Sequence, residues 1–324
     1  MTNTKKRCGL VAVCLALGLF VWIRELASWR PQKIGVWTDA RLVEDLGHGP
    51  WIVTSKQLIN VESGHEITVP ANATETSEYH FSPDGRTFAF TGEAGGNLCI
   101  EWRDCASGRL LRKFDKFFGN YESQSNFTFQ FLPEGKSLIL TADNGVEIST
   151  LNGSKFDFFT LPDKTGTASL SSHGKWLFIP KGDGGDIRNS KIYDLSKRRL
   201  QSEMQKGRGW VMEHQFSPDG NFIIISDTNG PGEDSGTWIA DVKTGHKLRD
   251  IATPFRYDFD FPFSPDSQRI VVPNSSGERE LRITQTGKTI RKLPSIFGSS
   301  TFAPDGNFLY VRDENGVLWK IRVR

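Results

Sequence analysis

Short runs of apolar residues recur along the chain, and each follows a polar turn. Examples are residues 87–90, 222–225 and 308–311. The turn before each run reads Ser-Pro-Asp-Gly or a near relative of it. Pro presets φ for a tight turn, and Gly accepts the left-handed conformation that closes a hairpin. Continuous apolar runs bounded by such turns predict strands buried on both faces.

The turn phrase occurs six times, and its fifth residue recurs at intervals of about 39 to 50 residues, which is a repeat length typical of propellers and solenoids. The fifth residues are Gly85, Gly135, Gly174, Gly220, Ser267 and Gly306. Most copies are followed by two more apolar segments joined by a second turn, as at 243–245. Four antiparallel strands per unit at this period predict a β-propeller blade.

Two copies of the phrase depart from the pattern. Residues 170–174 lack the Pro, and Ser267 stands where the other copies have Gly. Since both residues serve the geometry of the turn, we expect looser turns at these two places without the loss of a blade.

Strand-like segments also lie outside the six copies. Four of them read as a degenerate seventh unit, at residues 40–46, 50–54, 57–61 and 66–69. At the other end, the last unit ends after its third strand. An unpaired strand edge is a liability, so we expect 33–37 to close the ring by pairing with the last unit. The fold class predicted is all-β, a seven-bladed β-propeller over residues 33–324, with six or eight blades as alternatives.

The phrase resembles the WD40-like (TolB-type) propeller repeats, in which Ser-Pro-Asp-Gly joins the first two strands of a blade. The resemblance covers residues 33–324 and implies the propeller fold. It implies no single task, because such propellers serve many roles. The Gly-His partner of true WD40 repeats does not recur here, although third strands end in Asp at 104, 194 and 241. The Asp-His network of WD40 blades is therefore not expected.

Residues 1–32 differ from the rest of the chain. Lys5, Lys6 and Arg7 precede an uncharged apolar segment at 8–23. As a helix this segment spans about 24 Å, somewhat less than a hydrocarbon core of about 30 Å. We expect one hydrophobic N-terminal helix that serves as an uncleaved transmembrane signal anchor. A cleaved signal peptide with secretion, or a buried or disordered soluble N-terminus, is the alternative. A basic tail followed directly by an apolar run is typical of a translocating signal, which places the propeller outside the cytoplasm.

The charge of the chain limits its partners. The formal net charge is +2, and the first 32 residues hold five basic residues and one acidic residue, which leaves −2 for the propeller. A near-neutral propeller argues against nucleic-acid binding.

The sequence shows no familiar catalytic or metal-binding motif, and no catalytic residue, cofactor or metal site is predicted from it. His80 and His214 lie just before turn phrases, so they are expected to end inner strands near the ring axis as packed residues. Cys99 and Cys105 lie along one strand and its turn, too far apart for a disulfide, and are expected to be separate thiols.

Aromatic and Arg side chains gather in segments between the predicted blades, and such residues often dominate binding surfaces. The candidate surface consists of Phe117, Phe118, Tyr121, Arg208, Trp210, Arg256 and Tyr257. The function expected is a membrane-anchored, non-catalytic scaffold that binds another protein or an extracytoplasmic ligand. The alternative is an extracytoplasmic enzyme, similar to propeller lactonases or dehydrogenases, with a site on the central axis.

Overall fold

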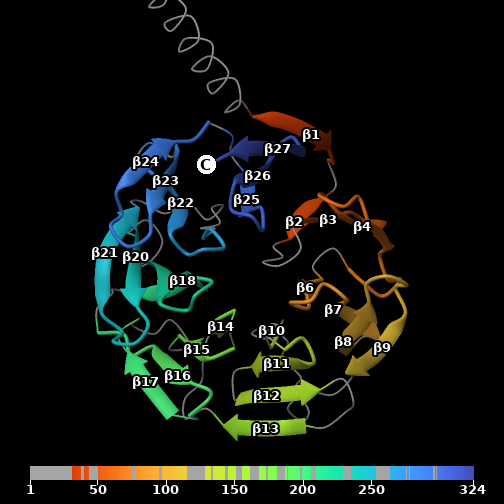
Figure 1. Cartoon of the computed structure of the whole chain (residues 1–324). Coiled ribbons are helices and arrows are strands. Elements are labelled where there is room, and N and C mark those ends of the chain that lie inside the picture. Colours follow the sequence, from red (N-terminus) through yellow and green to blue (C-terminus); the bar gives the residue numbers. More distant parts are fainter. Residues whose placement is uncertain are drawn as a thin grey trace, which may run out of the picture.

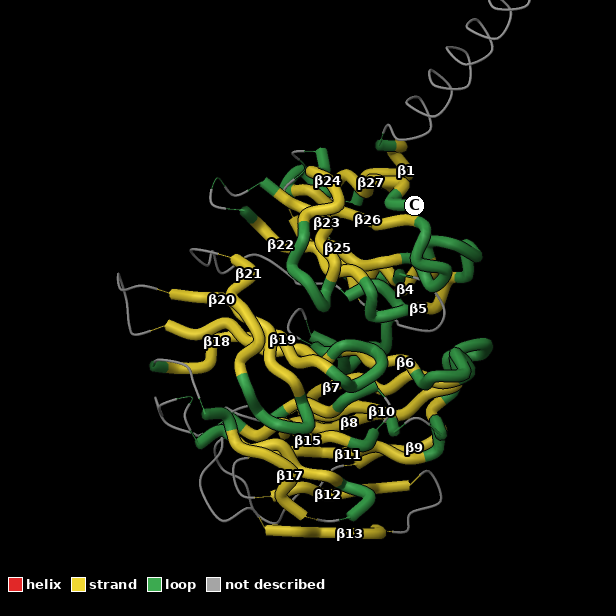
Figure 2. Tube along the Cα trace, turned by 60° about the vertical axis from the view of Figure 1, so that its left-hand side comes forward, coloured by secondary structure: helices red, strands yellow, loops and turns green. Residues whose placement is uncertain are grey.

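Each apolar run and the strands around it form a small antiparallel sheet, and the sheets are arranged in a ring (Figure 1). The computed structural model describes residues 31–37, 40–43, 50–74, 77–94, 97–114, 128–132, 134–142, 145–150, 155–160, 168–172, 174–180, 187, 189–197, 199–205, 209–228, 235–252, 263–274, 276, 278–294, 296 and 298–324. Within these ranges the regular structure consists of strands alone, which are yellow in Figure 2. The predicted all-β propeller is therefore confirmed.

Sheets I to III occupy the first half of the described chain, and each runs from its inner to its outer strand in sequence order. Sheet I contains β2 (Arg41–Val43), β3 (Trp51–Val53), β4 (Gln57–Asn60) and β5 (Glu66–Thr68). Sheet II contains β6 (Tyr79–Phe81), β7 (Thr87–Ala94), β8 (Asn97–Asp104) and β9 (Leu110–Phe114). Sheet III contains β10 (Thr128–Phe131), β11 (Ser137–Ala142), β12 (Gly145–Thr150) and β13 (Lys155–Thr160). The four strands of sheet I match the degenerate unit that the sequence predicts at 40–69.

Sheets IV to VI continue the ring in the same order. Sheet IV contains β14 (Ser169–Leu170), β15 (Trp176–Ile179), β16 (Lys191–Asp194) and β17 (Arg199–Glu203). Sheet V contains β18 (Trp210–Phe216), β19 (Phe222–Thr228), β20 (Ser235–Asp241) and β21 (Lys247–Ala252). Sheet VI contains β22 (Arg269–Pro273), β23 (Arg279–Ile283) and β24 (Thr289–Lys292).

Sheet VII joins the two ends of the described chain. It contains β25 (Gly298–Phe302), β26 (Phe308–Asp313), β27 (Val317–Arg322) and β1 (Gln32–Val36). β1 pairs antiparallel with β27, with Lys33 opposite Trp319 and Val36 opposite Val317. Figure 1 shows β1 as the outer strand beside β27. The predicted closure of the ring by residues 33–37 is confirmed.

The expected number of seven blades is wrong for the described residues, and six, one of the two alternative numbers, is the number of complete blades. The described residues form six four-stranded blades, while sheet VI has three strands. Among the described residues on its inner side, Phe263 makes a single bridge to Ile270. Residues 253–262, which precede Phe263, lie outside the described residues.

The core lies between the sheets. In the described part of the chain each pair of neighbouring sheets encloses one cluster of buried side chains, and the last cluster joins sheet VII to sheet I. Between sheets I and II, Trp51 stacks on Phe81 with ring centroids 4.3 Å apart. Cys99 and Cys105 are separate buried thiols, as expected. Apolar burial between the faces of neighbouring sheets therefore stabilises the ring.

The turn phrase has the chemistry that its residues predict. In the first copy the Ser82 hydroxyl donates to Asp84 Oδ1 (2.7 Å) and accepts from the Thr87 amide (3.0 Å). Gly85 closes the turn with φ +64° and donates its amide to Ser82 O (2.8 Å). The same Ser-Asp contacts occur at 217–219 and 264–266.

The two irregular copies are not looser, which corrects the expectation from the sequence. The Ser267 amide donates to Ser264 O at 2.7 Å, and the Gly174 amide donates to Ser171 O at 2.7 Å. Ser267 itself adopts the left-handed conformation, with φ 58°. The hydrogen bond that closes the turn joins backbone atoms only. It therefore forms in the copy that lacks Pro and in the copy that has Ser267 instead of Gly.

The predicted N-terminal helix and anchor at residues 1–32 lie almost entirely outside the described residues, which begin at 31. Among the residues described, none forms a helix long and apolar enough to cross a membrane.

Candidate functional site

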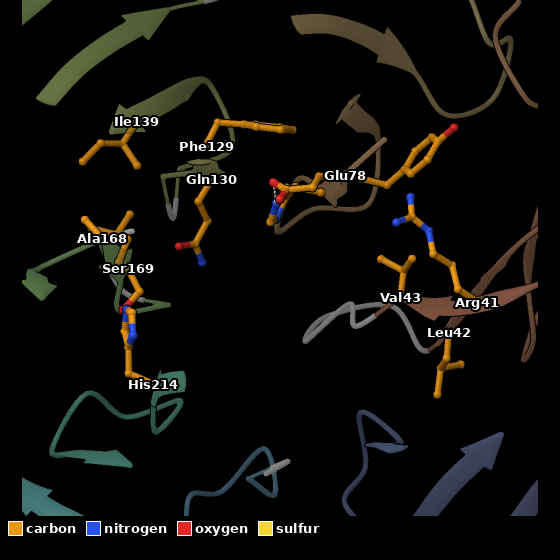
Figure 3. Close-up of a pocket in the computed structure, with 13 residues that line it drawn as sticks. Arg41, Leu42, Val43, Glu78, Phe129, Gln130, Ile139, Ala168, Ser169 and His214 are labelled. Carbon is orange, nitrogen blue, oxygen red and sulfur yellow. Dashed lines mark ion pairs between the residues drawn. The ribbon is translucent and has the colours of Figure 1, made fainter. Parts of the chain in front are cut away.

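A cavity of about 440 Å³ opens inside the ring. Its walls come from the inner strands of five neighbouring sheets, which are β2, β6, β10, β14 and β18, with Ile139 added from β11. Its polar lining residues are Arg41, Glu78, His80, Gln130, Ser169 and His214. In Figure 3, Arg41 lies on one side of the central space, Ser169 and His214 lie together on the other, and Glu78 and Gln130 lie between them.

The alternation of side chains along a strand explains how these residues reach the cavity. In β6, Tyr79 and Phe81 are buried in the cluster between sheets I and II, while His80 between them is partly exposed. Successive side chains of a strand point to opposite faces, so His80 faces sheet III, where it packs on Phe129 at the inner end of the blade. The innermost strands thus provide a polar lining within an apolar ring.

Arg41 is partly buried at one side of the cavity, with its guanidinium 5.5 Å from the centroid of the Tyr79 ring. Burial lowers the pKa of Arg41, while Tyr79 and Glu78 oppose this shift. Burial also raises the pKa of Tyr79 to about 12, so its hydroxyl stays protonated at neutral pH. Among the described residues, the charge of Arg41 interacts with that of Glu78.

Glu78 and His80 form the middle of the polar lining. Glu78 Oε2 lies 4.0 Å from His80 Nε2, which is a long contact for an ion pair. The His80 ring packs edge-on against Phe129, with centroids 4.7 Å apart. The side chain of Glu78 is 49% exposed, so its carboxylate remains available to a molecule in the cavity.

Ser169 and His214 carry buried polar atoms with no protein partner. Ser169 Oγ and His214 Nε2 are both buried, and neither has a hydrogen-bond partner among the described residues. The His214 ring packs on Phe178, with centroids 4.8 Å apart. Burial lowers the pKa of His214 to about 4, so the imidazole is neutral at physiological pH. β14 and β18 lie side by side, which brings these two atoms to the same wall.

The sequence anticipates part of this site. His80 and His214 do lie on inner strands near the axis, as predicted, and both pack against an aromatic ring. They also line the cavity, which the expectation of purely packed residues did not include. Arg41, Gln130 and Ser169 were missed. One signal was available, because His80, Gln130 and Ser169 each directly precede the first residue of a turn phrase.

The candidate surface predicted from the sequence is not tested. Phe117, Phe118, Tyr121, Arg208, Arg256 and Tyr257 lie outside the described residues. Trp210 is the first residue of β18, where its backbone pairs with Thr228. The surface therefore stays a prediction. Across the described part of the chain, no three His, Cys, Asp or Glu residues gather closely enough to hold a metal ion.

Comparisons with known proteins support the fold and no more than the fold. Neither a family model nor a curated protein sequence matches the chain. Among solved structures it is similar to hydrazine synthase of Kuenenia stuttgartiensis, with a TM-score of 0.58 and 13% sequence identity over 90% of this chain and 97% of that chain. A likeness at this identity concerns the fold and not the activity.

Proposed function

We propose that this chain is a binding protein whose cavity on the ring axis holds a small polar ligand. The observation that carries the proposal is the pair of buried atoms without partners, Ser169 Oγ and His214 Nε2, on one wall of that cavity. A buried polar atom without a partner costs roughly 1–3 kcal/mol. A small rotation of the two side chains toward the cavity would let a ligand hydrogen-bond to both atoms, and these bonds would remove that cost.

The shape and lining of the cavity agree with this role. Its volume of about 440 Å³ lies within the range of about 300–1,000 Å³ that is usual for small-molecule sites. Apolar residues such as Phe129, Ile139 and Leu170 alternate with the few polar groups. An apolar wall with a small number of placed polar groups is the usual composition of a ligand pocket.

We further propose that residues 8–23 anchor the chain in a membrane and that the propeller lies outside the cytoplasm. The support is the basic tail and the uncharged apolar segment of the sequence. Fractionation of cells that make the full chain, followed by protease treatment of intact cells, tests both statements. Release of the propeller into the medium supports secretion after cleavage, and recovery in the cytosol contradicts the proposal.

An enzyme at the same cavity is the second candidate. The supporting observation is His214, which lines the cavity with a neutral imidazole and lies beside Ser169. A neutral imidazole can accept a proton, which makes it a candidate base. If the native chain converts a ligand of the cavity, and His214→Gln still binds that ligand but no longer converts it, the enzyme is favoured over the binding protein.

A protein partner on the candidate surface is compatible with a ligand in the cavity. Replacing Trp210 and Tyr257 by Ala is expected to weaken cross-linking of the full chain to its partner in membranes without unfolding the protein. If both variants unfold, these side chains serve packing instead of recognition.

The thermal unfolding of the full chain, measured with mixtures of small metabolites, tests the cavity directly. A ligand that binds only the folded state raises the unfolding temperature. The increase is expected to disappear in His214→Phe, which fills the wall and removes the unpartnered nitrogen. The exposed His246 provides a matched control, since His246→Phe should keep the increase. An equal increase in His214→Phe would place the ligand elsewhere.

A further inference from the structure

The two charged groups of the cavity restrict the charge of its ligand. Arg41 lies on β2 and Glu78 directly precedes β6 of the neighbouring sheet, and their charges interact without forming a direct ion pair. The carboxylate of Glu78 accepts no hydrogen bond from the described residues, and the guanidinium of Arg41 donates none. One cation and one anion therefore face the same space with free hydrogen-bonding capacity.

This pairing disfavours ligands that carry only one sign of charge. A phosphate or dicarboxylate that approaches Arg41 also meets the negative charge of Glu78. A simple amine that approaches Glu78 meets the positive charge of Arg41 in the same way. A ligand that carries a carboxylate and an ammonium close together satisfies both groups, and Arg can hold the carboxylate with two parallel hydrogen bonds.

The opposite wall recognises a different part of the ligand. Phe129 and Leu170 add apolar surface to the lining of the cavity. There Ser169 Oγ and His214 Nε2 lack partners. The His214 ring is uncharged at neutral pH, so it suits an uncharged polar group rather than a third charge.

We propose that the ligand is a free α-amino acid with an uncharged polar side chain. Its carboxylate binds Arg41, its ammonium binds Glu78, and its side chain reaches Ser169 and His214. This proposal rests on the proposed function, since it names the ligand of the same cavity.

Titration calorimetry of the full chain with each of the twenty common amino acids tests the proposal. At least one amino acid with an uncharged polar side chain should bind. The analogue of that amino acid without its amino group, and the analogue without its carboxyl group, should each bind about tenfold more weakly or less, as expected for the loss of a charged hydrogen bond. If no amino acid binds, or if both analogues bind as well as the parent, the proposal is wrong.

Substitutions place the binding site. Arg41→Gln and Glu78→Gln should each weaken binding of the parent amino acid about tenfold or more. Arg199→Gln and Glu314→Gln are matched controls at exposed positions and should not change it. Unchanged binding in both cavity variants would overturn the proposal. If a cavity variant fails to fold, the two analogues on the native chain still decide the question.

The same experiment separates this inference from the proposed function. If amino acids do not bind, but another metabolite binds the native chain and not His214→Phe, the cavity is a ligand site and only the ligand class is wrong. If His214→Phe weakens the binding of no metabolite, both proposals are wrong.

Discussion

The Ser267 hydroxyl accepts a hydrogen bond from the backbone amide of Asp219, at 2.9 Å, and so links sheet VI to sheet V. Ser267 occupies the position where five other copies of the turn phrase have Gly, and it retains the left-handed conformation. The side chain that strains the turn therefore also binds the neighbouring turn.

Two substitutions at position 267 separate these effects. Ser267→Ala keeps the strain and loses the hydrogen bond, so it should lower the free energy of unfolding by about 1 kcal/mol. Ser267→Gly loses the same bond but removes a strain of about 1–2 kcal/mol, so its stability should stay close to that of the native chain. Urea unfolding of both variants measures which of them has the lower free energy of unfolding. Equal loss in the two variants would show that the left-handed conformation costs little here.

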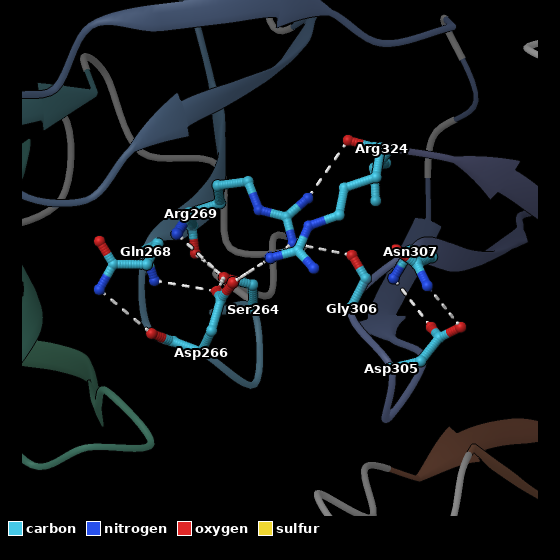
Figure 4. A network of polar contacts seen from close by, with 9 residues as sticks. Ser264, Asp266, Gln268, Arg269, Asp305, Gly306, Asn307 and Arg324 are labelled. Atoms are coloured by element: carbon cyan, nitrogen blue, oxygen red, sulfur yellow. Dashed lines mark hydrogen bonds and ion pairs between the residues drawn. The ribbon is translucent and has the colours of Figure 1, made fainter.

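Arg269 links sheet VI to the last sheet. It is 7% exposed and donates to Gly306 O (2.8 Å) and Val323 O (3.2 Å), with Asp266 at 3.8 Å (Figure 4). Arg269→Met leaves these acceptors without their donor and should lower the free energy of unfolding by about 3 kcal/mol.

Arg324 provides the matched control for Arg269. It also binds the Asp266 carboxylate, but its side chain is 52% exposed (Figure 4). Exposed ion pairs contribute little, so Arg324→Met should cost less than about 1 kcal/mol. Denaturant unfolding compares the two variants, and equal losses would show that the buried carbonyl contacts of Arg269 do not stabilise the ring.

Closure of the ring by β1 can be tested by truncation. Deletion of residues 1–31 leaves β1 (Gln32–Val36) in place, whereas deletion of 1–37 removes it and exposes the edge of β27. An exposed strand edge favours association between chains. The longer deletion should therefore unfold at a lower temperature and elute as larger species in size exclusion. Identical behaviour of the two chains would mean that another segment closes the ring.

The stability of the protein should depend on pH through His214. Burial lowers its folded pKa to about 4 from the usual value of 6.5, so the unfolded chain binds more protons between these values. Stability therefore rises with pH across that window and levels off above it, and the total effect is on the order of 3 kcal/mol. Urea unfolding from pH 4 to 7 measures the slope.

Carboxylates act in a lower pH range. Burial alone would raise the pKa of Asp219 and Asp266, but hydrogen bonds, led by Ser217 and Ser264 respectively, hold both values below normal. Their stabilisation is lost only as the pH falls below the ordinary carboxyl range. His214→Phe should therefore lose the slope above pH 4 and keep the loss below it. If the free energy of unfolding of His214→Phe still rises with pH between 4 and 6.5 as in the native chain, another titrating group causes the rise.

Much of the fold was predictable because its signals are local. Pro, Asp and Gly specify the turns between adjacent strands, and apolar runs mark buried strands, so even the degenerate sheet I and the pairing of 33–37 could be expected. The shape of the turn at Ser267 was not predictable, because its hydroxyl binds Asp219 in a neighbouring sheet.

The residue types along the chain were enough to predict the repeating sheets, their turns and the strand that closes the ring. Arg41, Glu78, Gln130, Ser169 and His214 come together only in the folded ring, because they lie on or directly before the inner strands of five different sheets. The spacing of these residues along the chain does not reveal that they share a cavity. Their inner strands come together only because whole sheets pack side by side in the ring. Local residue chemistry therefore specifies the blades, and closure of the ring creates the site.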